Sequence, residues 1–110
     1  MTIKIDKELF QWEQNREVFV DFDKDETQTY YIQFFNPKTQ QSPLTQITEG
    51  RALIPNELLQ FCLPITALIC TETQVLARKE FKVLKRPKPE GYDNTLKELL
   101  ELNKILGGGI

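Results

Sequence analysis

The sequence has no histidine, and among its 110 residues it has only two cysteines, one tryptophan and one methionine. Without histidine, the chain can build neither a Ser-His-Asp or Cys-His nucleophile system nor a His-ligated zinc site. Cys62 and Cys70 form no CxxC cluster, so a metal site is not expected. We expect both to be free buried thiols, as in a reducing cytoplasm, with a disulfide across a turn at Pro64 as the alternative.

An excess of charge is also missing, because 14 basic and 16 acidic side chains leave a formal net charge of −2. Nucleic-acid binding needs a basic excess to neutralise phosphates, so no nucleic-acid partner is expected. The longest uncharged stretch, from Leu58 to Thr71, is interrupted by Gln60 and Pro64 and is shorter than the roughly 20 residues of a membrane helix. Residues 1–10 alternate apolar with polar side chains, so neither a signal peptide nor a membrane partner is expected.

Motifs of nucleotide-binding and hydrolytic enzymes are missing as well, since the chain has no P-loop, no GxGxxG and no GxSxG. Asp21, Asp23 and Asp25 alternate as in a calcium loop, but Glu26 replaces the glycine of the sixth position and Ile32 the carboxylate of the twelfth. We therefore expect a solvated acidic turn there. The chain is expected to be no enzyme and to need no cofactor or metal, which favours a structural or interaction role.

The first three quarters of the sequence have a hydrophobic period of two, which is typical of β-strands. With 40% hydrophobic and 27% charged residues, the composition is that of a single globular domain whose core needs no disulfide or metal. The expected strands are Ile3–Ile5, Leu9–Trp12, Glu17–Phe22, Thr27–Phe35, Leu44–Ile47, Arg51–Ile54, Ile65–Thr71 and Gln74–Leu84.

Two expected strands that follow each other in the sequence differ in the number of apolar faces. Glu17–Phe22 alternates apolar with polar residues and should have one buried face, whereas Thr27–Phe35 is aromatic on both faces and is a candidate central strand. A hairpin through the charged turn at residues 23–26 is the simplest connection between them. Pro55–Leu59 is expected to form one helical turn that crosses between sheets, so the pattern predicts a two-sheet sandwich.

Alternating prolines mark the expected end of the sandwich. We expect the sandwich domain to span residues 1–86 and a linker to span 87–94. Thr95 and Glu98 form a capping box, so residues 95–110 are expected to be a short amphipathic α-helix followed by a glycine tail. This helix should pack on its own sandwich or on helices of other copies. In the second case, the expected contacts of a trimer or hexamer are Leu96, Leu99, Leu102 and Leu106.

A basic run from Arg78 to Lys88 contains six cations and one carboxylate. Lysines on an edge strand limit strand-to-strand aggregation, which is the common reason for such a pattern. The run is also compatible with a weak anion-binding patch or with a docking surface for an acidic partner protein. Lys82 and Arg86 are therefore candidate partner contacts.

Three segments of the chain resemble a known family: Phe10–Arg16 (FQWEQNR), Ile54–Gln60 (IPNELLQ) and Phe81–Tyr92 (FKVLKRPKPEGY). Together they are similar to the N-terminal domain of the baseplate upper protein family, and to small tail-associated proteins, of phages and prophages of Gram-positive bacteria. The resemblance spans residues 1–92. It implies a mainly β fold, an immunoglobulin-like antiparallel β-sandwich, that docks to the tail or baseplate and presents whatever follows it.

The same resemblance implies a function and a location. It implies a non-enzymatic virion structural protein that is assembled in the host cytoplasm and contacts other tail or baseplate proteins. Family members commonly continue into a receptor-binding portion, whereas here 18 residues follow Tyr92, which favours assembly, oligomerisation or capping. Two alternatives remain: a small phage-encoded intracellular effector that binds a host protein, and a module that binds host cell-wall carbohydrate through exposed members of the set Trp12, Tyr30, Tyr31 and Tyr92.

Overall fold

The computed structural model describes residues 1–23, 27–39 and 43–92, and in this part the chain is mainly β with almost no helix. The elements are, in order, β1 (Thr2–Ile5), β2 (Leu9–Phe10), β3 (Glu17–Asp21), β4 (Tyr31–Phe35), β5 (Thr45–Gln46), β6 (Arg51–Leu53), the 3₁₀ helix η1 (Asn56–Gln60), β7 (Ile65–Cys70), β8 (Val75–Phe81) and β9 (Val83–Leu84). The predicted mainly β class is confirmed. The expected C-terminal helix, with Leu96, Leu99, Leu102 and Leu106, lies outside the described residues.

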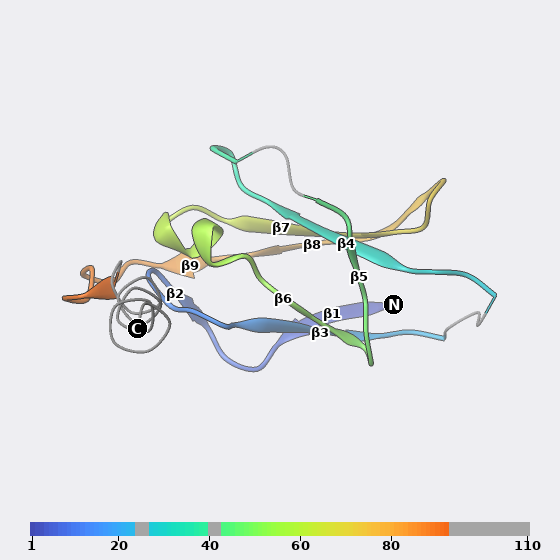
Figure 1. Cartoon of the computed structure of the whole chain (residues 1–110), viewed down its shortest axis with the longest axis horizontal. Coiled ribbons are helices and arrows are strands. Elements are labelled where there is room, and N and C mark those ends of the chain that lie inside the picture. Colours follow the sequence, from blue (N-terminus) through green and yellow to red (C-terminus); the bar gives the residue numbers. More distant parts are fainter. Residues whose placement is uncertain (24–26, 40–42, 93–110) are drawn as a thin grey trace, which may run out of the picture.

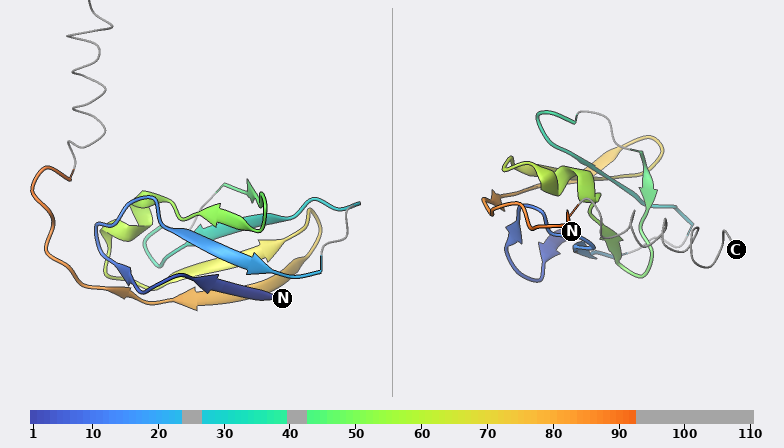
Figure 2. Two further views of the ribbon diagram at one scale, coloured as in Figure 1. Left: turned by 90° about the horizontal axis from the view of Figure 1, so that it is seen from below. Right: turned by 60° about the vertical axis from the view of Figure 1, so that its left-hand side comes forward.

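The strands form three sheets, of which two are large. One antiparallel sheet has the order β1-β3-β6, and the other has the order β5-β4-β7-β8. These two sheets lie in separate layers, as Figure 1 and the two views of Figure 2 show. The third sheet pairs β2 with β9 in parallel, with Leu9 opposite Val83 and Phe10 opposite Leu84.

One cluster of buried side chains joins the two large sheets, and strand alternation decides which residues belong to it. In β3, Val18 and Val20 are buried as predicted, whereas Phe19 points to the opposite face and is 39% exposed. In β4, Ile32 and Phe34 are buried. The strand β4 lies between β5 and β7, which confirms the prediction that this segment is an interior strand.

The predicted hairpin between the third and fourth strands is wrong. β3 pairs with β1 and β6, whereas β4 pairs with β5 and β7, so the connection between them passes from one sheet to the other. The physical reason is burial, because two strands with apolar faces cover each other better from opposite layers than side by side in one sheet. The charged turn in this connection includes residues 24–26, which lie outside the described residues.

Several predicted strands are shorter than expected: Leu9–Trp12 is a strand only over Leu9–Phe10, and Leu44–Ile47 only over Thr45–Gln46. The segment expected at Thr27–Phe35 is a strand only from Tyr31, because the residues before it belong to the crossing between the sheets. The segment expected at Gln74–Leu84 is interrupted at Lys82, because β8 ends at Phe81 and β9 begins at Val83. Beyond that point β9 leaves the antiparallel ladder with β7 and takes β2 as its neighbour.

The helical turn predicted between the sheets is confirmed as η1, which connects β6 in one sheet with β7 in the other. Leu58 and Leu59 of this turn are buried in the core cluster. No helix within the described part of the chain has the length and hydrophobicity that would let it span a membrane.

Both cysteines are free thiols, so the alternative of a disulfide is not realised. Cys70 is buried at the end of β7, and this burial raises the pKa of its thiol. The expectation that Cys62 is buried is wrong, because its side chain is exposed. Cys62 lies in the connection between η1 and β7, outside the strand that buries Cys70, and its Sγ donates a hydrogen bond to the carbonyl oxygen of Val83 at 3.3 Å.

Gly50 lies in the turn that leads into β6, where its φ is +71° and an added Cβ would lie 3.1 Å from the carbonyl oxygen of Val20. We expect Gly50→Ala to lower the free energy of unfolding in urea by about 1–2 kcal/mol, because it combines backbone strain with this close approach. Gly91→Ala is the matched control, since Gly91 has a φ of +78° but nothing within 4 Å of an added Cβ. A loss at Gly91 as large as that at Gly50 would contradict the role of the close approach.

Candidate interaction site around Trp12

The two predicted contact residues within the described chain have different surroundings. Lys82 is exposed at the break between β8 and β9. Arg86 is half-buried, and its Nη2 donates a hydrogen bond to the carbonyl oxygen of Trp12 at 3.1 Å. Arg86 is thus engaged within the chain, and the structure does not bring these two cations into one site. The four predicted leucine contacts lie outside the described residues.

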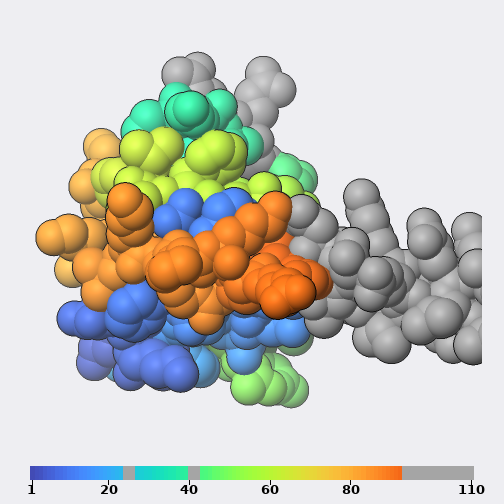
Figure 3. All heavy atoms as spheres, turned by 90° about the vertical axis from the view of Figure 1, so that its left-hand side faces the viewer, coloured from blue at the N-terminus to red at the C-terminus, as the bar shows by residue number. Residues whose placement is uncertain are grey.

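The residue that Arg86 contacts, Trp12, is the centre of a junction between three segments that are far apart in the sequence. We call Phe10–Arg16, Ile54–Gln60 and Phe81–Tyr92 together the Trp12 junction. The backbone N–H of Trp12 donates to the carbonyl oxygen of Leu59 at 2.7 Å, and the backbone N–H of Gln11 donates to that of Leu84 at 2.8 Å. Figure 3 shows the blue, yellow-green and orange segments meeting on this face of the molecule.

Aromatic contacts complete the Trp12 junction. The rings of Trp12 and Tyr92 meet edge to face, with centroids 5.2 Å apart and an interplanar angle of 71°. The ammonium of Lys88 lies 5.2 Å from the centroid of the Trp12 ring, within the range of a cation–π interaction. Tyr92 is 9% exposed, so the proline-containing segment after β9 returns to the surface of the domain.

Trp12 has a backbone conformation that bulky residues rarely adopt. Its φ is +71°, in the left-handed region, and Asn15 in the same loop has a φ of +58°. Such a conformation persists where surrounding contacts hold it. Here the N–H of Trp12 bonds to Leu59 and its carbonyl to Arg86, while the N–H of Asn15 donates to Oδ1 of Asn56 at 3.0 Å. The loop conformation is therefore fixed by contacts from both distant segments.

A shallow hollow of about 330 Å³ lies beside this loop. The residues that line it are Trp12, Glu13, Gln14, Arg86, Pro89, Glu90 and Tyr92. The Nε of Arg86 is buried there and has no hydrogen-bond partner among the described residues. The surface is mixed in charge and partly aromatic, which suits contact with a protein surface.

Arg16 anchors the loop that contains Trp12 through its guanidinium. The sequence alone did not single out this residue. It is 7% exposed, and its guanidinium donates to Oδ1 of Asp6 at 3.0 Å, to the carbonyl oxygens of Lys7 and Glu8 at 2.6 and 2.9 Å, and to Oε1 of Glu13. These contacts fix the path from β1 to β2. The only local signal in the sequence was the spacing of three residues between the carboxylate of Glu13 and this arginine.

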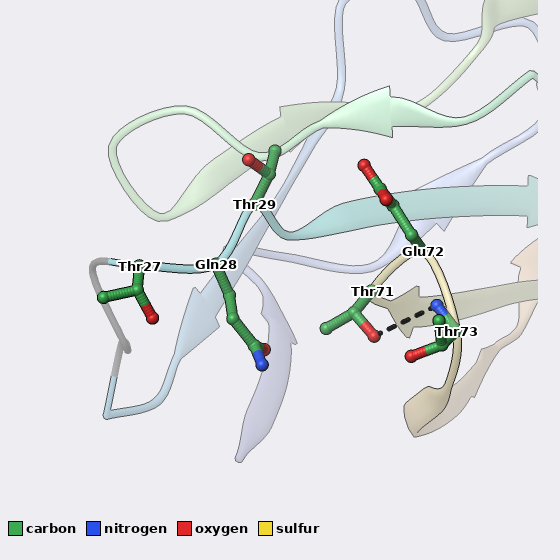
Figure 4. A pocket seen from close by; sticks show the side chains of 6 residues that line it. All are labelled: Thr27, Gln28, Thr29, Thr71, Glu72 and Thr73. Atoms are coloured by element: carbon green, nitrogen blue, oxygen red, sulfur yellow. Dashed lines mark hydrogen bonds between the residues drawn. The ribbon is translucent and has the colours of Figure 1, made fainter.

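A second recess lies at a different place, between the connection from β3 to β4 and the turn from β7 to β8. It has a volume of about 270 Å³ and is lined by Thr27, Gln28, Thr29, Thr71, Glu72 and Thr73. Figure 4 shows these side chains around it. The Oγ1 of Thr71 accepts hydrogen bonds from the backbone N–H groups of Thr73 and Gln74, at 3.4 and 3.2 Å, so this hydroxyl is used to shape the turn.

The aromatic residues considered for carbohydrate binding are not assembled into one platform. Trp12 and Tyr92 contact each other in the Trp12 junction. Tyr30 packs against Phe22, with ring centroids 4.7 Å apart, and against the core. Tyr31 begins β4 and lies on the opposite face of that strand from the buried Ile32. None of the six residues that line the polar recess is aromatic.

Groups that could bind a metal ion are dispersed over the described residues. Within residues 1–23, 27–39 and 43–92, no cluster of three or more His, Cys, Asp or Glu side chains could hold a metal ion. The carboxylates of Asp6 and Glu13 are bonded to the guanidinium of Arg16. The contacts around Trp12 hold three segments of the chain together, and the hollow beside them offers a contact surface.

We expect Arg16→Ala to lower the free energy of unfolding in urea by about 2–3 kcal/mol, because it removes a charged donor shared by four acceptors. Arg51→Ala is the matched control. Arg51 is 53% exposed and lies 3.8 Å from Glu17 and 3.9 Å from Glu49, so its loss should cost less than about 1 kcal/mol. Equal losses for the two variants would contradict the anchoring role of Arg16.

The hydrogen bond from Arg16 lowers the pKa of Asp6 below the ordinary value of 3.8. A carboxyl whose pKa is lower in the folded state stabilises that state fully above its unfolded pKa and loses this contribution as the pH falls through the folded pKa. We therefore expect Asp6→Asn to be destabilising at about pH 6 and progressively less so as the pH falls below 3.8, as measured by urea denaturation over a series of pH values. An effect of equal size at every pH would show that the charge of Asp6 is not involved.

Comparisons of the sequence with known protein families and curated proteins, and of the structure with solved structures, give no match.

Proposed function

We propose that this chain is a non-enzymatic structural module of a phage virion, located in the tail or baseplate and acting through contacts with other tail or baseplate proteins. The observation that carries the proposal is the Trp12 junction. The three segments whose sequences resemble the phage family are separated along the chain, yet they contact one another directly through Trp12. Segments that contact one another in the fold support the resemblance to the phage family more strongly than segments scattered over the surface would.

We also infer that the two large sheets form an immunoglobulin-like sandwich. If β1, β3 and β6 are strands A, B and E, then β5, β4, β7 and β8 take the places of C′, C, F and G. Both sheet orders follow this scheme, and so does the crossing from β3 in one sheet to β4 in the other. The buried disulfide of antibody domains has no counterpart, because both cysteines are free.

The proposed domain plan remains that of a sandwich over residues 1–86, a linker over 87–94 and an oligomerising segment over 95–110. Within the linker, Lys88 and Tyr92 contact Trp12, so its first part is held against the sandwich. Such contacts would give the following segment a defined starting point on the domain surface. A ring of three or six copies would multiply weak contacts into a stable assembly.

Quantitative mass spectrometry of purified tail or phage particles from the source strain tests the virion proposal. We expect the chain to be present in a stoichiometric multiple of three or six. Its presence in infected cells together with its absence from particles would overturn the proposal and favour the intracellular effector. Retention on purified cell-wall polysaccharide, lost when Trp12 is replaced by alanine, would instead favour the carbohydrate-binding module.

We expect Leu99→Asp with Leu106→Asp to abolish oligomers while leaving the β-sheet circular dichroism unchanged, because charges on the apolar stripe would oppose contact between copies. Light scattering measures the mass. The matched control is Leu44→Asp, since Leu44 is 52% exposed on the described domain and should leave the mass unaltered. An unchanged mass in the double variant would reject oligomerisation through this segment.

A further inference from the structure

The guanidinium of Arg86 belongs to a half-buried side chain and has no ion pair in the described chain. Its Nη2 donates to the carbonyl oxygen of Trp12 at 3.1 Å, and this is its one hydrogen bond with the described residues. Nε is buried and has no acceptor there. Nη1 also has no acceptor in this part of the chain, and because Nε is the only nitrogen of the group that is both buried and unpaired, Nη1 is accessible to solvent.

Arg16 shows how a buried guanidinium is satisfied in the same domain. It donates to four acceptors, and two of them are the carboxylates of Asp6 and Glu13. Arg86 has one neutral acceptor instead. Removing a charged group from water is costly unless a counter-charge and hydrogen bonds replace the water. The described residues do not supply this counter-charge to Arg86.

Arg86 lines the hollow of about 330 Å³ beside the Trp12 loop, and part of the wall is aromatic and apolar. This part consists of Trp12, Pro89 and Tyr92, and the two rings meet edge to face. The segment that carries Arg86 and Pro89 is orange in Figure 3 and lies on the surface of the domain. Tryptophan, tyrosine and arginine are the residues that most often dominate binding at protein interfaces. A group bound at Arg86 therefore meets apolar surface beside the cation.

Two carboxylates line the same hollow, and their contacts differ. Glu13 is bonded to Arg16. Glu90 is exposed and forms no ion pair with any described residue. Neither carboxylate is within the 4.0 Å ion-pair distance of Arg86. The charge of Glu90 opposes an incoming anion, so its removal should strengthen the binding of an anion in the hollow.

The shape and charge of the hollow favour one class of anion. Small-molecule sites enclose most of their ligand, whereas this shallow hollow can admit a side chain that another surface carries. Glu13 and Glu90 would repel a doubly charged phosphate more strongly than a carboxylate with a single charge. The planar fork of a guanidinium also matches the geometry of a carboxylate. The occupant that fits is thus an aspartate or glutamate side chain with an apolar neighbour.

We propose that the hollow beside Trp12 receives an acidic side chain of a partner protein. The carboxylate of that side chain pairs with the accessible edge of the Arg86 guanidinium, and the apolar neighbour lies against Trp12 and Pro89. The pair supplies the counter-charge that Arg86 lacks within the described chain. This inference names the chemistry of a docking partner and so rests on the proposed role as a virion interaction module.

Two synthetic peptides with blocked ends test the proposal with the full chain. One is acetyl-Ser-Leu-Glu-Leu-Ser-amide, and the other has Gln in place of Glu. Trp12 is the only tryptophan of the chain, so its fluorescence reports on the hollow directly. We expect the Glu peptide to bind saturably, with a Kd of about 1 mM or tighter, and at least about fivefold more tightly than the Gln peptide. The Nε–H resonance of Arg86 should shift in NMR spectra with the same midpoint.

Substitutions locate the binding. Arg86→Gln should weaken the Glu peptide at least about fivefold, because it removes the cation while keeping a hydrogen-bond donor. The matched control is Lys85→Gln, since Lys85 is the adjacent exposed cation and does not line the hollow. Glu90→Gln should tighten binding about two- to threefold, because it removes the repelling carboxylate. This gain is a result that an unfolded variant could not show.

Several results would overturn the inference. These are no saturable binding of the Glu peptide, equal binding of both peptides, or equal weakening by Arg86→Gln and Lys85→Gln. Displacement of the Glu peptide by inorganic phosphate at equal concentration would show a general anion site instead. Displacement by a synthetic peptide of residues 93–110 would assign the hollow to the chain's own C-terminal segment. Finding the chain in particles while the Glu peptide fails to bind would leave the virion proposal intact and reject only this hollow as the docking site.

Discussion

The buried guanidinium of Arg16 is the interaction on which the arrangement of the first half of the chain depends. Its donors reach acceptors on Asp6, Lys7, Glu8 and Glu13, and these acceptors span the path between β1 and β3. The carbonyl oxygen of the same residue accepts a hydrogen bond from the N–H of Ile54 at 2.8 Å, which ties this path to the end of β6. A charged group can be buried at this position because it is hydrogen-bonded on several sides.

The contacts of Arg16 also affect which strand β2 pairs with. With the β1–β2 connection held by Arg16, β2 leaves the sheet of β1 and lies beside β9 instead. The loop that follows β2 places Trp12 between η1 and the segment after β9.

The Trp12 junction is made of contacts within the chain. Arg86 donates a hydrogen bond to the carbonyl oxygen of Trp12, and the ring of Tyr92 meets the Trp12 ring edge to face, so the segment from Arg86 to Tyr92 is held against the domain.

The amino-acid sequence by itself determined the mainly β class, the alternation of β3, the interior position of β4 and the helical turn of η1. Each of these depends on a period or a turn residue that acts within a few neighbouring residues. Only the tertiary structure decided that β3 and β4 lie in different sheets, that β9 separates from β8, that Cys62 is exposed, and that Arg16 and Trp12 are centres of contact. These outcomes depend on hydrogen bonds and burial between segments tens of residues apart, which local patterns do not encode because strand pairing is chosen by the packing of the whole domain.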